Sequence, residues 1–86
     1  MNRQANIQLC VGVLELLSQR ELSRVTHIMY ELNANCNSLK NQLSFMEEQG
    51  LVEKKAIEKK RVGYSITKQG SIILNSFNEF KEYSVS

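Results

Sequence analysis

Several residue types are missing from this sequence of 86 residues, and each absence excludes a class of chemistry. The chain has no proline, no tryptophan and no aspartate, and His27 is its only histidine. Without aspartate it cannot form a Ser-His-Asp triad, and it also lacks the glycine loop that binds nucleotide phosphates. The neighbouring Glu47 and Glu48 are expected to be solvated rather than catalytic. We therefore expect no catalytic residues and a protein that is not an enzyme.

Cysteine is scarce as well. Cys10 and Cys36 stand far apart, with no CxxC pair and no histidine cluster nearby, so we expect no metal site and no cofactor. In a reducing compartment both would be small buried apolar groups, and a disulfide within or between chains is the minority alternative. The longest apolar run is too short to span a bilayer, and the N-terminal MNRQAN lacks the apolar core of a signal peptide. These features predict a cytoplasmic protein with no membrane partner.

What is present indicates a single domain over residues 1–86. A core of this size is marginal, and dimerisation is a common way to enlarge it. Residues 5–19 are expected to form a first helix that is apolar on two sides. One side would face the core of the domain. The other side, with Leu9, Val13 and Leu16, is expected to face a second subunit.

Two shorter helices are predicted next. Residues 24–32 have apolar positions at helical spacing, with Ser23 as the expected N-cap. The stretch NAN at 33–35 breaks this pattern, and Asn35 can cap a third helix at 36–49 that Gly50 ends. The inner stripe of the third helix is expected to comprise Cys36, Leu39, Leu43 and Met46.

The outer face of the predicted third helix is polar and almost uncharged. It presents Asn37, Ser38 and Asn41, with Lys40 at its edge. Phe45 also lies toward this side, and we expect it to pack under the hairpin or at a subunit contact. Amide and hydroxyl groups suit the edges of base pairs, which offer donors and acceptors rather than charge. A surface with little charge and no special role explains this one feature equally well.

Positive charge is concentrated in one segment. The chain carries a net charge of +2, whereas residues 51–70 hold six basic residues against two glutamates, a local excess of +4. Residues 51–55 and 62–66 are predicted to be strands joined by AIEKKR at 56–61, which places the charge on a β-hairpin. Its basic residues are Lys54, Lys55, Lys59, Lys60 and Arg61. The alternative is a solvated loop that the lysines keep soluble.

A last helix is predicted from Thr67, its expected cap, to about residue 83. Ile73, Phe77 and Phe80 continue a seam from Gly70 at spacings of three and four residues, as in coiled coils. This helix either packs on its own domain or, as we prefer for so short a chain, shares an interface with a second subunit.

The order of these elements defines the fold class. We predict an α+β, mainly helical, winged helix-turn-helix with three helices, a two-stranded β-hairpin wing and a C-terminal helix. In a helix-turn-helix the second helix enters the major groove and the first crosses the DNA backbone. A basic hairpin after it would lie beside the same duplex, on phosphates or in the minor groove.

Three stretches carry a family resemblance over about residues 6 to 83: THIMY, SLKNQLSFMEEQGLVE and GYSITKQG. With them the chain resembles the small archaeal winged-helix predicted transcriptional regulators, including those encoded by archaeal viruses and plasmids. The resemblance implies a homodimer joined through helices 5–19 and 67–83, a recognition helix at 36–49 and a wing at about 54–63. The eight asparagines and six glutamines depart from the composition that hyperthermophilic proteins favour.

A second departure concerns His27, which stands where such proteins often carry Arg or Lys beside the DNA backbone. A neutral His weakens a phosphate contact or makes it depend on pH, and a surface His with no special role is the simpler alternative.

Our hypothesis from the sequence is a sequence-specific regulator that binds double-stranded DNA as a homodimer, with no small-molecule ligand evident. The bases would be contacted by Asn37, Ser38, Lys40 and Asn41, and the backbone by Thr26, His27, Lys54, Lys55, Lys59, Lys60 and Arg61. It would act in the cytoplasm at the nucleoid, or in the host cytoplasm if viral. The alternatives are a protein-interaction adaptor and an architectural DNA-binding protein without strong sequence preference.

Overall fold

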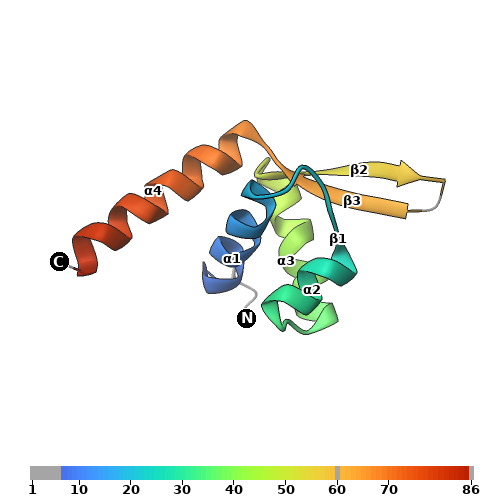
Figure 1. Ribbon diagram of the computed structural model, residues 1–86, viewed down its shortest axis with the longest axis horizontal. Helices are drawn as coiled ribbons and strands as arrows, with labels where there is room; N and C mark the ends of the chain where they lie inside the picture. The colour runs from blue at the N-terminus through green and yellow to red at the C-terminus, as the bar shows by residue number, and fades with distance from the viewer. Residues whose placement is uncertain (1–6, 60, 86) are drawn as a thin grey trace.

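The chain folds into three packed helices from which a β-hairpin and a long helix extend in opposite directions (Figure 1). The computed structural model describes residues 7–59 and 61–85, with side chains as far as residue 79. The elements are α1 (Ile7–Ser18), β1 (Ser23–Arg24), α2 (Val25–Leu32), α3 (Cys36–Glu48), β2 (Val52–Glu58), β3 (Arg61–Ile66) and α4 (Lys68–Val85). None of the helices in these ranges has the length and apolar character that crossing a membrane requires.

The core lies where α1, α2 and α3 meet the base of the sheet. Its fully buried side chains are Val13, Leu14, Leu17, Ile28, Leu39, Leu43 and Met46. Burying a leucine or isoleucine side chain contributes about 1.5–3 kcal/mol, so this cluster fixes how the three helices pack. The predicted inner stripe of α3 is confirmed at Leu39, Leu43 and Met46.

The prediction that both cysteines are buried holds for Cys10 and is wrong for Cys36. Cys10 lies in α1 with 6% of its surface exposed, whereas Cys36 is exposed. Cys36 is the first residue of α3. Leu39, one turn later, is the first residue of this helix that lies in the core. Both thiols are free, so neither forms a disulfide in this chain.

The sheet has three antiparallel strands in the order β1-β3-β2. The hairpin was predicted, but its strands are longer than expected because the pairing continues to Glu58 opposite Arg61. The strand β1 was not predicted, because two residues are too short to show a period of two. Ser23 therefore pairs with Tyr64 instead of capping α2, and the N-cap of α2 is Arg24, which makes no side-chain capping bond.

The helix ends follow the turn residues closely. Asn33 adopts the left-handed conformation with φ 52°, and the side chain of Asn35 accepts hydrogen bonds from the backbone N–H groups of residues 37 and 38 at 2.9 and 3.3 Å. Thr67 caps α4 as predicted, because its Oγ1 accepts from the Gly70 N–H at 3.0 Å and donates to the Gly50 carbonyl oxygen at 2.7 Å. These bonds join the end of α3, the sheet and α4.

A side chain at Gly70 would collide with the backbone carbonyl oxygen of Leu51. Only glycine lets the first turn of α4 approach the start of the hairpin this closely. The wing and the last helix are therefore held together at one point of backbone contact.

Candidate nucleic-acid interface

The outer face of α3 carries the predicted base-contacting residues. Asn37, Ser38, Lys40 and Asn41 are all exposed. Asn37 and Asn41 lie opposite the buried stripe of α3, whereas Ser38 lies on the flank that lines a hollow with α1 and the end of α2, and Lys40 lies on the other flank. Packing of the buried side chains and the side-chain cap of Asn35 both hold the helix in place.

Phe45 lies one helical turn beyond Asn41, and 39% of its surface is exposed. The hairpin therefore leaves part of this side chain exposed, and a contact of Phe45 with a second subunit stays a prediction. Single exposed apolar side chains are common on protein surfaces. Apolar contact with the thymine methyl group is one of the ways in which proteins distinguish bases.

The basic residues of the hairpin are exposed but do not share one face. Side chains alternate along a strand, so Lys54 and Lys55 project from opposite faces of the sheet. Lys54 is paired with Tyr64, and its Nζ lies 6.0 Å from the centre of that ring. Lys55 is paired with Gly63 on the other face. Lys59 and Arg61 are exposed near the tip, and Lys60 lies outside the described residues.

Arg24 joins Lys55 on the outer face of the sheet. In the register of the three strands, Arg24 and Lys55 are both paired with Gly63, one from each side. Paired residues in a sheet point to the same face, so the two cations flank a position that has no side chain. Sequence reasoning missed Arg24 because it did not find β1. Arg24 makes no ion pair within the part of the chain that the structure describes.

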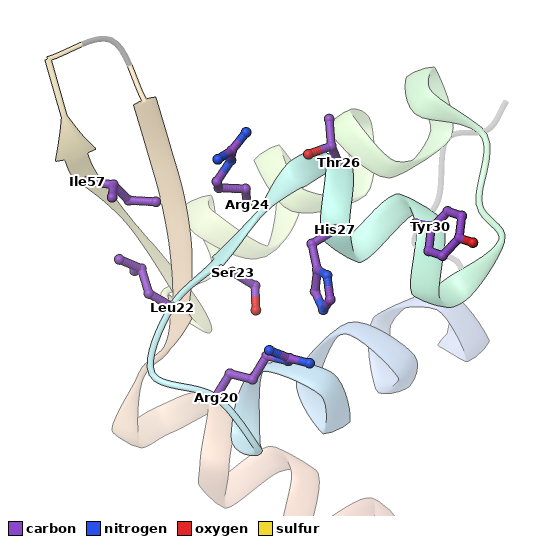
Figure 2. Close-up of a pocket in the computed structure, with 8 residues that line it drawn as sticks. All are labelled: Arg20, Leu22, Ser23, Arg24, Thr26, His27, Tyr30 and Ile57. Atoms are coloured by element: carbon purple, nitrogen blue, oxygen red, sulfur yellow. The ribbon is translucent and has the colours of Figure 1, made fainter.

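Thr26 and His27 open α2 but point in different directions. Figure 2 shows Thr26 on the same side as Arg24, while the ring of His27 points towards α1 and the guanidinium of Arg20. The Nε2 atom of His27 is 3.9 Å from the carboxylate of Glu31. Thr26 thus shares a side with Arg24 and His27 does not. That both residues contact the DNA backbone stays a prediction.

A family model for the winged helix-turn-helix matches residues 3–84, nearly the whole chain. The chain belongs to the winged helix-turn-helix family. This agrees with the geometry above, in which α2 and α3 form the helix-turn-helix and β2 and β3 form the wing. The predicted fold class is confirmed, with β1 as an added third strand.

Solved structures of other winged-helix proteins share this fold. The transcriptional regulator BldR from Sulfolobus solfataricus is 21% identical, with a TM-score of 0.82 over 91% of this chain and 57% of BldR. YusO from Bacillus subtilis is 14% identical, with a TM-score of 0.84 over 90% of this chain and 56% of YusO. RosR from H. salinarum is 23% identical, with a TM-score of 0.79 over 88% of this chain and 74% of RosR. No curated protein sequence matches the chain.

These likenesses establish the winged-helix fold that transcription regulators use. The chain spans less than two thirds of the length of BldR and of YusO, so the shared part is the winged-helix portion of those proteins.

The residues predicted for a dimer interface differ in how deeply the structure buries them. Leu9, Leu16, Ile73 and Phe77 are partly buried on α1 and α4, which pack against each other. Val13 needs a correction, because it is fully buried in the core of its own chain and presents no surface to a partner. The side chain of Phe80 lies outside the described residues.

Two further apolar residues on these helices are more exposed than those four. Ile7 on α1 and Ile72 on α4 have 56% and 58% of their surface exposed. Among the described residues there is also no group of three or more His, Cys or Glu side chains that could hold a metal ion.

Proposed function

We propose that this winged-helix chain is a transcription regulator that binds a specific sequence of double-stranded DNA as a homodimer, and that it is not an enzyme. The observation that supports the proposal is the presence of two unlike sets of exposed side chains on α3 and β2, two elements that lie in contact. The outer face of α3 offers uncharged donors and acceptors, and the hairpin beside it offers exposed cations.

On the outer face of α3, the amide groups of Asn37 and Asn41 can each pair with adenine through two hydrogen bonds. Lys40 can reach the acceptor atoms of guanine, and Ser38 can bond to either kind of base. Phe45 would add an apolar contact with a thymine methyl group. The side chains on this face therefore favour mixed sites rich in A·T pairs over uniform G·C sequence.

The hairpin and the start of α2 supply the contacts to phosphates. Lys55 and Arg24 share the outer face of the sheet, and Thr26 lies on the side of Arg24. Lys59, Lys60 and Arg61 near the tip would extend these contacts along the backbone or into the minor groove. The Nζ atom of Lys54 lies over the Tyr64 ring, where it makes a cation–π contact. Its charge also adds to the positive potential of the wing.

Homodimerisation is proposed through α1 and α4. Exposed Ile7 and Ile72, together with the partly buried Leu9, Leu16, Ile73 and Phe77, would be covered by a second copy. A twofold dimer would place two α3 helices in successive major grooves, about 34–36 Å apart, and would favour a palindromic site. A dimer mass at micromolar concentration supports this part, and a monomer there contradicts it. Such a regulator acts at the nucleoid, in the cytoplasm of its cell or of a viral host.

The experiment that tests the proposal is a titration of the protein with random duplex DNA and with duplexes selected for binding, at several salt concentrations. A regulator binds the selected duplexes about 10³-fold or more tightly than random sequence at physiological salt. Equal affinity for every duplex would instead identify an architectural DNA-binding protein. No binding even at low salt would mean that the basic hairpin contacts a protein, as in an adaptor.

A further inference from the structure

The chain leaves α3 through a tightly bonded turn. Gly50, just after the helix, has a φ of 78°, and the N–H of Leu51 donates to the carbonyl oxygen of Met46 at 2.9 Å. Backbone bonds of this kind close the C-terminus of a helix and fix the direction in which the chain leaves it. The carbonyl groups of Gly50 and Leu51 are therefore held at set positions relative to α3.

Thr67, the residue before α4, bonds to both of these carbonyl groups. Its Oγ1 donates to the carbonyl oxygens of Gly50 at 2.7 Å and Leu51 at 3.0 Å, and its N–H donates to that of Leu51 at 3.1 Å. A hydroxyl has a single hydrogen, so the two oxygens share it. The same Oγ1 accepts from the N–H of Gly70 at 3.0 Å. One side chain thus links the end of α3 to the first turn of α4, although the whole hairpin separates these helices in the sequence.

Gly70 brings the two backbones into contact. A Cβ atom at this position would collide with the carbonyl oxygen of Leu51 and would lie 2.9 Å from the Cγ1 atom of Ile66. The hydrogen bonds of Thr67 and this close approach leave the first turn of α4 little room to rotate. We call Gly50, Leu51, Thr67 and Gly70 together the α3–α4 junction.

The direction of α4 is set near its start. Beyond the junction the helix is anchored by Leu74, which is buried in the core, and by Ile73, which packs against the core. Its far half extends away from the other three helices (Figure 1). The helix has 18 residues and is about 27 Å long, so a tilt of about 10° at its start moves its far end by about 5 Å. This displacement exceeds the rise of about 3.4 Å between successive base pairs.

We propose that Thr67 and Gly70 are positioning residues, which set the direction of α4 relative to α3 and thereby the separation of the two α3 helices in the dimer. The proposal rests on the homodimer and the DNA binding proposed above. The other helix of that interface, α1, is packed into the core and has a fixed direction, whereas the direction of α4 depends on the junction. The separation of half-sites that the dimer prefers follows from the separation of its α3 helices.

A helix cap is the simpler role for Thr67. In that role it would stabilise the first turn of α4 and do nothing else. A cap requires only the bond from the N–H of Gly70, however, and the hydroxyl also reaches carbonyl groups 16 and 17 residues away in the sequence. Loss of a cap changes stability. Loss of a positioning residue also changes a distance between subunits, and this difference can be measured.

The first arm of the test contains no DNA and measures that distance directly. Cys36 is exposed at the first residue of α3 and Cys10 is buried, so a nitroxide reagent labels one site in each subunit. Double electron–electron resonance then gives the distance between the two labels of the dimer. We expect one narrow distribution for the wild type. Thr67→Val keeps the size of the side chain and loses the hydroxyl, and it should broaden the distribution or shift its maximum by about 5 Å, as a tilt of about 10° would.

Two further variants serve as rescue and control. Thr67→Ser keeps the hydroxyl and should restore the distribution of the wild type. Ser18→Ala is the matched control, because it removes an exposed hydroxyl that donates to a carbonyl oxygen of its own helix, that of Glu15 at 2.7 Å. It should leave the distance unchanged.

Gly70→Ala should change the distance more than Thr67→Val does, because it forces the two backbones apart. Thermal melting checks that each variant is folded, and if Gly70→Ala is not, the variants of Thr67 still decide. If Thr67→Val lowers the melting temperature and keeps the distance of the wild type, Thr67 is only a helix cap and the proposal is wrong.

The second arm uses duplexes with two copies of the selected half-site, whose separation is changed one base pair at a time around one helical turn. We expect the wild type to bind one separation about tenfold more tightly than its neighbours. Thr67→Val should shift or lose this preference and bind a single half-site as the wild type does. Equal weakening on every duplex, the single half-site included, would be a loss of stability and would contradict the proposal.

Failure of the positioning role and failure of the proposed function give different results. A wild type that is monomeric, or that binds no duplex, contradicts the function proposed above and the positioning role with it. A wild type that dimerises and prefers one separation, together with a Thr67→Val variant that keeps both the distance and the preference, overturns the positioning role alone.

Discussion

The outer face of α3 and the hairpin wing lie in the same winged-helix unit but differ in packing and in charge. α3 is anchored by four buried side chains and presents mostly uncharged groups. In β2 only the first residue, Val52, is buried, and the strand carries charged side chains along most of its length. Because α3 is packed against the core, it cannot shift easily. Its exposed amide groups are therefore held in fixed positions that can match a pattern of bases. Beyond Val52, β2 has little packing to lose, although the middle of β3 is buried at Gly63, Tyr64 and Ser65. The cations of the wing suit a backbone whose charge is the same in every sequence.

The comparison teaches that stability, sequence preference and salt dependence should separate between the two regions. Changes on the buried side of α3 should affect stability, and changes on its outer face should affect sequence preference. Changes on the wing should lower the affinity for all duplexes and the salt dependence of binding. Single substitutions can test each of these statements.

The largest effect is expected for Leu43→Ala, which empties a fully buried position on α3. Loss of a buried leucine side chain costs about 2–5 kcal/mol, because apolar contacts are lost and a cavity remains. Urea denaturation followed by circular dichroism measures it. Lys55→Ala on the exposed wing is the control and should change the free energy of unfolding by less than about 0.5 kcal/mol. Equal losses for both variants would show that the wing is packed as firmly as α3.

Next in size is the contrast between Asn41→Ala and Lys55→Ala in DNA binding. Asn41→Ala should cost about 1–3 kcal/mol on the preferred duplex and relax the preference at one position. Its salt slope should stay the same, because no cation is removed. Lys55→Ala should weaken binding to all duplexes alike and lower the salt slope by about one unit. Titrations at four salt concentrations, on preferred and random duplexes, separate the two. A change of sequence preference in Lys55→Ala would contradict the division of roles.

The same comparison explains which parts could be predicted from the sequence. α3 and its buried residues Leu39, Leu43 and Met46 followed from helical spacing, because burial on one face leaves a period that the sequence preserves. The helix caps at Asn35 and Thr67 could also be predicted, because their side-chain oxygens accept hydrogen bonds from N–H groups only two or three residues further along the chain. The hairpin itself followed from alternation and charge.

The parts that could not be predicted depend on contacts between distant segments. β1 has two residues and exists only because Tyr64 and Gly63 lie beside it, so the role of Arg24 was hidden. Val13 was placed on the wrong face because α1 is apolar nearly all round, and a helix of this kind has no period that tells core from subunit contact.

A smaller effect is expected for Asn35→Ala, which removes the side-chain cap of α3. Loss of an N-cap costs about 1 kcal/mol, within a range of about 0.5–2, because two backbone N–H groups lose their acceptor. The cap lies next to Asn37 and Ser38, so fraying here should also weaken binding to the preferred duplex more than to random DNA. Asn35→Ser restores an acceptor and should recover most of both losses, as measured by thermal melting and titration. If Asn35→Ala weakened both duplexes equally, the start of α3 would not contact bases.

The smallest effect concerns the reactivity of the two thiols, one buried in the core and one exposed on the surface. Burial raises the pKa of the Cys10 thiol, so at pH 8 it has less thiolate than an ordinary cysteine, and it is also shielded by the core. Cys36 is exposed at the start of α3, beside the proposed base contacts. Iodoacetamide at pH 8, followed by mass spectrometry, should therefore modify Cys36 quickly and Cys10 slowly, and Cys36→Ser should leave only the slow reaction.

Adding the preferred duplex sharpens the thiol experiment into a test of the interface. DNA in contact with the start of α3 should slow the modification of Cys36 and leave Cys10 unchanged, because only the first lies where the duplex would cover it. Rising pH should speed the reaction of Cys10, since its raised pKa leaves more thiol to ionise, while the packing of α1 still limits access. If bound DNA left Cys36 as reactive as before, the duplex would contact the wing without α3 in its groove. The proposed role of α3 in reading bases would then be wrong.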